Sequence, residues 1–279
     1  MQRIPGREIA DQILDGLKKE IATKNLHPRL GVLLVGNDPA SDLYVTLKQK
    51  AAQRIGIRTD IKKLPAETPD QKLLEIIQTW NKDPEVNGIL IQLPLPEGHD
   101  TDALIAAIDP KKDADGFHPK NLEALKNASA KIVPPLHEGI LRLIASTNVT
   151  PNHSLAIIVA NSHLFADPLK YILEKAGATV KVMIAKDTSR SHSVDDAELR
   201  EADIIVVAVG KQGFLTSNSV QDGAVVIDVG TNKTPDNKVR GDFNPEGTDH
   251  MQGWYSPVPG GVGPMTVAML MKTVKEMAG

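Results

Sequence analysis

The chain has 279 residues, 41% hydrophobic and 24% charged, and its 32 basic and 35 acidic residues leave a formal net charge of -3. Basic residues are dispersed among acidic ones, and no apolar run approaches the ~20 residues that span a bilayer, so we expect neither a nucleic-acid-binding nor a membrane protein. The lack of cysteine excludes disulfides and thiolate ligands. Because the eight histidines form no HxH or HxxxH cluster, we expect no metal site. Because the N-terminus has no signal-peptide pattern, we expect a cytoplasmic location.

Apolar runs alternate with amphipathic stretches along most of the chain, which is typical of βαβ units. The expected buried strands are Gly31–Val35, Ile57–Lys63, Asn87–Gln92, Leu155–Val159, Thr179–Ile184, Ile204–Val209 and Val225–Val229. Between them, Thr68-Pro69-Asp70-Gln71 predicts an N-cap with a capping box, and Asp167-Pro168 predicts the start of another helix. Further helices are expected over Glu138–Ser146 and Met265–Met277.

This order of elements predicts an α/β fold of two domains, each with a parallel-rich sheet flanked by helices, with a cleft between them. The boundary is expected at Val133-Pro134-Pro135. Residues 134–261 would form a second, Rossmann-like domain. Residues 1–133 would form the first domain together with residues 262–279, because the Gly/Pro-rich segment before the last helix could lead that helix back to the first domain.

Two elements of the first domain carry candidate site residues. Ser41 can cap the helix after the first strand, which places Tyr44 and Lys48, four residues apart, on one helix face. Gln92 ends an apolar strand and needs a hydrogen-bond partner if it is buried. Lys48 could be that partner, because both elements end at the same sheet edge. The plain alternative is a surface lysine, a half-buried tyrosine and an exposed glutamine.

Two loops supply further candidates. Asp115 lies in KKDADGFHP, where an Asp-Gly pair is a common turn, but where a carboxylate could also accept two N–H donors from an amino-heterocycle. The segment PVPGGVGPMT holds three glycines and three prolines. It predicts a stiff loop without bulky side chains, suited to close approach by a flat ligand.

The segments YVTLK, GILIQLPLP, KKDADGFHP and PVPGGVGPMTVA, in this order and spacing, resemble the folate-site signatures of the bifunctional methylenetetrahydrofolate dehydrogenase/cyclohydrolase family. AVGKQGF and GAVVIDVGTN also match, so the resemblance covers nearly the whole chain. It implies oxidation of 5,10-methylenetetrahydrofolate to the 5,10-methenyl form with NADP, followed by hydrolysis to 10-formyltetrahydrofolate. It further implies an oxidoreductase and hydrolase of one-carbon metabolism and purine biosynthesis, acting as a homodimer through the second domain.

The resemblance also implies roles for the candidate residues in a folate-binding catalytic first domain. Lys48 would be the catalytic amine, Gln92 would hydrogen-bond and tune it, and Asp115 would bind the pterin-like ring. Tyr44 would stack on the p-aminobenzoyl part. The remaining wall would be lined by Pro259, Gly260 and Gly261. A non-catalytic folate-binding or interaction module would be expected to lose the lysine, the glutamine and the aspartate, yet all three stand in complete motifs.

The turn after the strand Leu155–Val159 departs from the family pattern. The family has a Gly-basic-Ser turn followed by Val-Gly and a proline, and only Ser162 and Pro168 remain here. Ala160 and Ala166 replace glycines that let backbone amides approach a pyrophosphate. These replacements change the turn at which the second domain would be expected to bind the phosphates of a dinucleotide.

Four other replacements also depart from the family pattern. Asn161 replaces a basic residue that would face the 2′-phosphate of NADP, Phe165 replaces valine, and Pro134-Pro135-Leu136-His137 replaces a Pro-Cys-Thr-Pro pattern. After Val182, Ile184-Ala185 stands where the family has a polar pair.

Three alternatives follow for the cofactor. NADP could bind in a modified way, with Lys186 or Arg190 supplying positive charge to the 2′-phosphate. The cofactor could be NAD, or the dehydrogenase activity could be weak or absent, leaving a cyclohydrolase or a folate-binding module. We favour NADP, and the expected cofactor contacts are Asn161, Ser162, Lys186 and Thr231.

Overall fold

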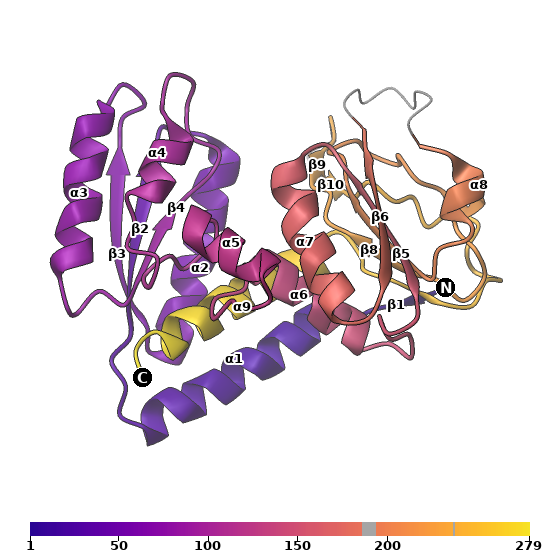
Figure 1. Ribbon diagram of the computed structural model, residues 1–279, viewed down its shortest axis with the longest axis horizontal. Coiled ribbons are helices and arrows are strands. Elements are labelled where there is room, and N and C mark those ends of the chain that lie inside the picture. The colour runs from indigo at the N-terminus through magenta and orange to yellow at the C-terminus, as the bar shows by residue number, and fades with distance from the viewer. Residues whose placement is uncertain (186–193, 237) are drawn as a thin grey trace. The chain divides into compact units, whose positions relative to one another are not determined.

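The computed structural model describes residues 1–185, 194–236 and 238–279. These residues form two compact units, which we call unit 1 (Met1–Ile9 and Leu136–Thr266) and unit 2 (Ala10–Pro135 and Val267–Gly279). Each unit is an α/β structure built on a parallel sheet with helices beside it (Figure 1). The predicted fold class is therefore confirmed.

Unit 2 contains a three-stranded parallel sheet in the order β3-β2-β4. Its strands are β2 (Arg29–Val35), β3 (Arg58–Leu64) and β4 (Gly88–Ile91). The helices that follow these strands are α2 (Pro39–Ile55), α3 (Asp70–Lys82), α4 (Thr101–Ala106) and α5 (Pro119–Lys126). Two more helices, α1 (Gly6–Thr23) and α9 (Val262–Glu276), begin in unit 1 and continue into unit 2.

The main core of unit 2 lies between its sheet and α3. Leu33 and Val35 of β2 pack with Ile89 and Ile91 of β4 and with apolar residues of α3 and α4, including Leu73, Ile77, Trp80, Leu104 and Ile105. Each such side chain stabilises the fold by about 1.5–3 kcal/mol when fully buried. Gly31 is needed here, because a Cβ at that position would lie 2.8 Å from the Trp80 ring. This packing holds β2 and β4 rigidly, so the residues at their carboxyl ends have fixed positions.

Unit 1 contains a six-stranded parallel sheet in the order β1-β11-β8-β7-β5-β6. The strands are β1 (Gln2–Arg3), β5 (Leu155–Ala160), β6 (Thr179–Ile184), β7 (Ile204–Ala208), β8 (Val225–Asp228) and β11 (Trp254–Tyr255). The chain passes from β5 to β6 on one side and to β7 on the other, so the strand order reverses beside β5. Rossmann-like folds bind ligands at the carboxyl ends of strands at such a reversal.

The other elements of unit 1 surround this sheet. They are α6 (Pro135–Ala145), α7 (His163–Lys175), α8 (Asp196–Leu199), the short 3-10 helix η1 (Ser217–Ser219), and the antiparallel pair β9 (Asn232–Lys233) and β10 (Val239–Arg240). Helix α7 packs beside β5 and β6. Apolar side chains of β5, β7 and β8 are fully buried, which explains why these strands appear in the sequence as continuous apolar runs.

The division into units differs from the expected domain bounds at the N-terminus. Gln2 pairs with Trp254, so β1 extends the sheet of unit 1, although residues 1–133 were expected to form a single domain. A strand of two residues is too short to show a period of two in its hydrophobic pattern. Its place could therefore be found only from the strand it pairs with.

Helix α7 begins earlier than expected. Its N-cap is Ser162, whose Oγ accepts a hydrogen bond from the backbone N–H of Leu164 at 3.1 Å, so the predicted start at Asp167-Pro168 is wrong. Pro168 lies inside the helix. The absence of an N–H on proline removes one helical hydrogen bond, and the buried face of α7 holds the helix together across that position.

Two other predicted caps are also wrong. In α3, Pro69 precedes the helix, and the hydroxyl of Thr68 donates to the carbonyl of Pro65 at 2.8 Å instead of forming a capping box. In α2, the cap is Asp38, whose carboxylate accepts from the backbone N–H of Ser41 at 2.8 Å. Several polar residues near each helix start can cap it, and the sequence does not distinguish them.

Candidate active site

The amine of Lys48 lies at the centre of the candidate site in unit 2. Lys48 is buried on α2, and its Nζ donates a hydrogen bond to Oε1 of Gln92 at 2.9 Å. Gln92 follows β4 directly, and it is buried as well. The predicted partnership between this lysine and this glutamine is present in the structure, and the alternative of a surface lysine and an exposed glutamine is wrong.

The amide of Gln92 is held in one orientation. Its Nε2 donates to the carbonyl oxygen of Leu93 at 2.7 Å, which leaves Oε1 directed at Lys48. The backbone N–H of Gln92 donates to the carbonyl of Leu33 on β2 at 2.8 Å. Both ends of the residue are therefore anchored, and the lysine amine faces a fixed acceptor.

The loop that carries Asp115 runs along β4. Ile89 pairs with Asp113 in a parallel bridge, and the carboxylate of Asp113 accepts from the backbone N–H groups of Gly116 at 3.1 Å and His118 at 2.8 Å. Asn121 adds a third donor to Asp113 at 2.9 Å. These bonds stiffen the loop, so the side chain of Asp115 is presented from a rigid turn.

Lys48 and Asp115 act on each other through their charges. Desolvation of the buried amine lowers the pKa of Lys48 below its usual value, and the negative charge of Asp115 partly opposes this shift. Burial raises the pKa of the Asp115 carboxyl to about 6, against the lowering effect of Lys48 and with a smaller raising effect from Asp113. A buried amine and a buried carboxyl that both titrate closer to neutrality than usual are suited to acid–base chemistry.

Tyr44 lies on α2 one helical turn before Lys48 and is half-buried. Nearby, Leu43 and Leu47 are exposed by 56% and 40%. The surface of α2 around the tyrosine is therefore apolar, which is compatible with the predicted stacking on an aromatic ring. The stacking itself stays a prediction.

Pro259, Gly260 and Gly261 belong to unit 1. Gly260 has a φ of 111°, a conformation that favours glycine, and a Cβ on Gly6 would lie 2.7 Å from the carbonyl oxygen of Gly261. The segment is therefore tightly packed against the start of α1, without bulky side chains. Its expected part in the folate site stays a prediction.

The two alanines that replace glycines in the turn after β5 are fully buried. Ala160 is the last residue of β5 and Ala166 lies on the inner face of α7. Their methyl groups are therefore packed inside unit 1, and they do not fill the space outside the turn. Between them, Ser162 caps the start of α7.

Asn161 joins two neighbouring turns of unit 1 by hydrogen bonds. Its Nδ2 donates to the carbonyl of Val209 at 3.2 Å, and its backbone N–H donates to the carbonyl of Ala208, also at 3.2 Å. The side chain thus ties the turn after β5 to the turn after β7. These two turns flank the point where the strand order reverses.

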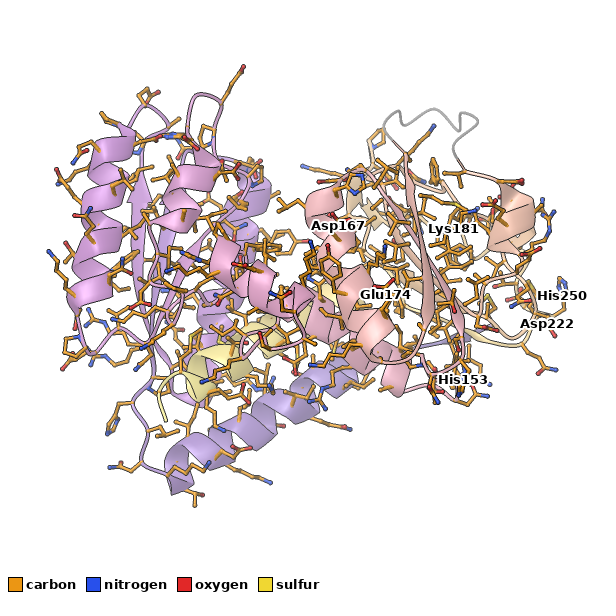
Figure 2. The ribbon with its side chains drawn as sticks, viewed as in Figure 1. His153, Asp167, Glu174, Lys181, Asp222 and His250 are labelled. Atoms are coloured by element: carbon orange, nitrogen blue, oxygen red, sulfur yellow. The ribbon has the colours of Figure 1, made fainter. Side chains whose placement is uncertain are left out.

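His137 and Phe165, two departures from the family pattern, pack against each other. Their rings stack with centroids 5.2 Å apart, and Nε2 of His137 bonds the carbonyl oxygen of Phe165 at 2.9 Å. Burial lowers the pKa of His137 to about 4, so the ring is neutral at pH 7. In the first turns of α7, His163 and Asp167 form an exposed pair at 3.0 Å; Figure 2 labels Asp167 on this helix.

Among the other expected cofactor residues, Thr231 is exposed between β8 and β9. Lys186 and Arg190 lie outside the described residues. A cavity of about 390 Å³ in unit 1 is lined by other residues, which include Arg3, Arg240 and Tyr255. It is therefore separate from Asn161, Ser162 and Thr231.

Over residues 1–185, 194–236 and 238–279, no His, Asp and Glu side chains gather in a group of three or more that could hold a metal ion. Within the same ranges, no helix combines the length and apolar character needed to cross a lipid bilayer.

Comparison with known proteins assigns this arrangement to a family. The model of the catalytic domain of tetrahydrofolate dehydrogenase/cyclohydrolase matches residues 4–115, and the model of its NAD(P)-binding domain matches residues 134–279. The chain belongs to the tetrahydrofolate dehydrogenase/cyclohydrolase family. The resemblance inferred from the four sequence segments is thereby confirmed.

Full-length relatives agree with this membership. The bifunctional protein FolD of Methanosphaerula palustris is 42% identical over 275 residues, covering 99% of this chain and 96% of that protein. The FolD crystal structure from Campylobacter jejuni matches with a TM-score of 0.92 at 34% identity, covering 100% of this chain and 98% of that one. A FolD from Trypanosoma brucei, solved with NADP cofactor and an inhibitor, matches with a TM-score of 0.90 at 30% identity, covering 99% and 96%.

Sequence reasoning missed two buried carboxylates of this family member, Asp228 and Asp242. Asp228 ends β8, an otherwise apolar strand, just as Gln92 follows β4. The same rule, that a buried polar residue at a strand end needs partners, would have singled it out. Burial raises the pKa of Asp228 to about 7, although the hydrogen bonds that its carboxylate accepts from backbone N–H groups act to lower this pKa.

Proposed function

We propose that this chain oxidises 5,10-methylenetetrahydrofolate to 5,10-methenyltetrahydrofolate with NADP and hydrolyses the product to 10-formyltetrahydrofolate. Family membership over both domains supports the pair of reactions. The observation that carries the proposal is the buried hydrogen bond between Lys48 and Gln92, with Asp115 acting on the same amine. A non-catalytic folate-binding module would not need an amine that is desolvated and held against a fixed acceptor.

In the hydrolysis, water adds to the methenyl carbon, which already has cationic character. The added water loses both of its protons as the formyl C=O forms and the bond from this carbon to N5 breaks; N5 keeps the electron pair and receives one proton, and the other proton goes to solvent. Lys48 can carry a proton between these positions, because its pKa is lowered toward neutrality by desolvation. Gln92 keeps the amine oriented, and Asp115 would hold the pterin-like ring beside it.

In the oxidation, NADP would supply the hydride acceptor. The residues of this chain would bind and orient that cofactor. Ser162 caps α7 at the expected phosphate position, and Asn161 and Thr231 lie at the carboxyl ends of the central strands. The burial of Ala160 and Ala166 fits a dinucleotide, because neither methyl group blocks the turn. Lys186 would supply charge to the 2′-phosphate, and we keep the folate contacts expected for Tyr44 and for Pro259, Gly260 and Gly261.

We keep NADP as the cofactor, since the Trypanosoma brucei relative is described in complex with it. The NAD-dependent and cyclohydrolase-only alternatives have no further observation in their favour. We also propose a cytoplasmic homodimer that serves one-carbon metabolism and purine biosynthesis. Light scattering of the purified protein would test the dimer, and a monomer at all concentrations would contradict it.

A paired assay tests the proposed function. We expect the purified protein to hydrolyse methenyltetrahydrofolate and to reduce NADP with methylenetetrahydrofolate, with NAD offered separately as a comparison. Lys48→Met should lower the rate of hydrolysis by about 100-fold or more, as expected for loss of a general acid–base group. Lys50→Met, which removes an exposed lysine from the same helix, is the matched control and should keep full activity. Hydrolysis at a normal rate in a folded Lys48→Met protein would contradict the proposed role.

A further inference from the structure

The carboxylate of Asp242 occupies a nest of backbone N–H groups in the turn after β7. Its Oδ2 accepts from the N–H of Val209 at 2.6 Å and of Gly210 at 2.9 Å, and its Oδ1 accepts from the N–H of Lys211 at 2.9 Å. Three successive N–H groups that converge on one anion form a strong binding site for negative charge. Here that site is filled by a fully buried side chain of the chain itself.

The same carboxylate also holds the first residue of β9. Nδ2 of Asn232 donates to Oδ1 of Asp242 at 2.8 Å and to the carbonyl of Arg240 at 3.2 Å. Asp242 therefore links the turn after β7 with the residue that directly follows Thr231.

Asp228 completes the arrangement from the end of β8. Its Oδ1 accepts from the N–H of Gly230 at 2.9 Å and of Asp242 at 3.0 Å, and its Oδ2 accepts from the N–H of Phe243 at 2.8 Å. Thr231 thus stands between two residues, Gly230 and Asn232, each held by one of the two carboxylates.

Two glycines make this packing possible. A Cβ on Gly230 would lie 2.2 Å from Oδ1 of Asp242, and a Cβ on Gly241 would lie 1.8 Å from Oδ2 of Asp228. Both distances are far below van der Waals contact, so any side chain at these two positions would displace a carboxylate. The backbone of these two glycines is therefore closely packed against the two carboxylates.

Asn161 connects the third turn. Its side chain donates to the carbonyl of Val209, whose own N–H is held by Asp242. A continuous set of hydrogen bonds therefore joins the turns after β5, β7 and β8. These are the carboxyl-end turns where a Rossmann-like sheet binds a dinucleotide.

We propose that Asp242 is a positioning residue for the dehydrogenase reaction, which sets the relative placement of the three turns and thereby the affinity for the dinucleotide without touching it. The proposal rests on the proposed function. It assigns to unit 1 a residue whose loss weakens cofactor binding and leaves the hydrolysis in unit 2 unchanged.

Asp242→Asn is the direct test. Asparagine has nearly the same size, but its amide NH₂ would face backbone N–H groups that now bond a carboxylate oxygen, so the turns must move. We expect the KM for NADP to rise about tenfold or more, the order produced by the loss of one buried hydrogen bond to a charged group. We expect kcat at saturating NADP and the rate of methenyltetrahydrofolate hydrolysis to stay within about twofold of wild type.

Two further variants keep the test decisive if Asp242→Asn folds poorly. Asn232→Ala removes the side-chain bonds from Asn232 to Asp242 and to the carbonyl of Arg240 but leaves the bonds from residues 209–211 to Asp242, so we expect a smaller rise in the KM for NADP in a folded protein. Asp236→Asn is the matched control between β9 and β10, because this exposed carboxylate interacts with Thr234 and Lys238 rather than with the three turns. It should leave the KM unchanged.

The outcomes separate this proposal from the proposed function. An unchanged KM for NADP in Asn232→Ala and in any folded Asp242→Asn protein overturns the positioning role. A parallel loss of oxidation and hydrolysis, with no change in KM, overturns it too and indicates a general structural role. Absence of NADP-linked oxidation in the wild-type protein removes the proposed function, and this proposal with it.

Discussion

At the scale of single residues, Lys48 and Asp115 determine the chemistry of the site together. Desolvation is the largest influence on both groups: it lowers the pKa of the amine and raises the pKa of the carboxyl. Each charge then moves the other pKa back toward its ordinary value. Gln92 contributes no charge, so its part is to hold the amine through a single fixed acceptor.

Removal of the Asp115 charge should shift the titration of Lys48. Because the carboxylate raises the pKa of the amine, Asp115→Asn should lower that pKa further. The pH at which the amine loses its proton would then move down, which can be measured from the pH dependence of Lys48 labelling by an amine reagent. Asp102→Asn, at an exposed position on α4, is the control and should leave the titration unchanged. A pKa of Lys48 that stays the same or rises in Asp115→Asn would contradict this coupling.

At the scale of elements, polar residues recur where buried strands end. Gln92 follows β4, Asn161 follows β5, and Asp228 ends β8. Each forms hydrogen bonds to another element. Gln92 and Asp228 are buried, where a polar group without a partner is costly, whereas Asn161 is exposed. The central strands were predictable because they are covered on both faces and form continuous apolar runs. The edge strand Thr179–Ile184 is more exposed, but it is found with the predicted bounds.

Helix starts were the weaker part of the prediction, and α7 offers a test of the cap that the structure assigns. Ser162→Ala removes the acceptor for the Leu164 N–H and should lower the free energy of unfolding of unit 1 by about 1 kcal/mol. Ser162→Asn retains a side-chain acceptor and should stay close to wild type. Denaturant unfolding without cofactor measures both variants. Equal stability of the alanine and asparagine variants would show that another residue caps the helix.

At the scale of the whole molecule, each unit contains one of the two tryptophans, Trp80 in unit 2 and Trp254 in unit 1. The unfolding of each unit can therefore be followed separately. This matters because a protein of two units need not unfold in a single cooperative step. Trp80→Phe leaves Trp254 as the reporter of unit 1.

Unit 1 should lose stability in mild acid because of His137. Its pKa is about 4 in the folded state and about 6.5 when exposed, so between these values the unfolded chain binds a proton that the folded protein does not. The free energy of unfolding should fall by about 3 kcal/mol as the pH drops from about 6.5 to about 4. In the Trp80→Phe background, His137→Gln should show a weaker decline with pH, because glutamine does not titrate. The same decline in both proteins would assign the acid sensitivity to other groups.

The sequence by itself determined the alternation of strands and helices and the family, because these depend on local periodicity and on motifs that are contiguous along the chain. It also indicated the pairing of Lys48 with Gln92, 44 residues apart, because both elements end at the same edge of a parallel sheet. Only the tertiary structure placed residues 1–9 in unit 1 and brought the carboxylate of Asp242 to the N–H groups of residues 209–211. The bonds of Asp242 join segments about 30 residues apart, and Asp242, unlike Gln92, does not end a buried apolar strand, so no local pattern indicated that it needs a partner.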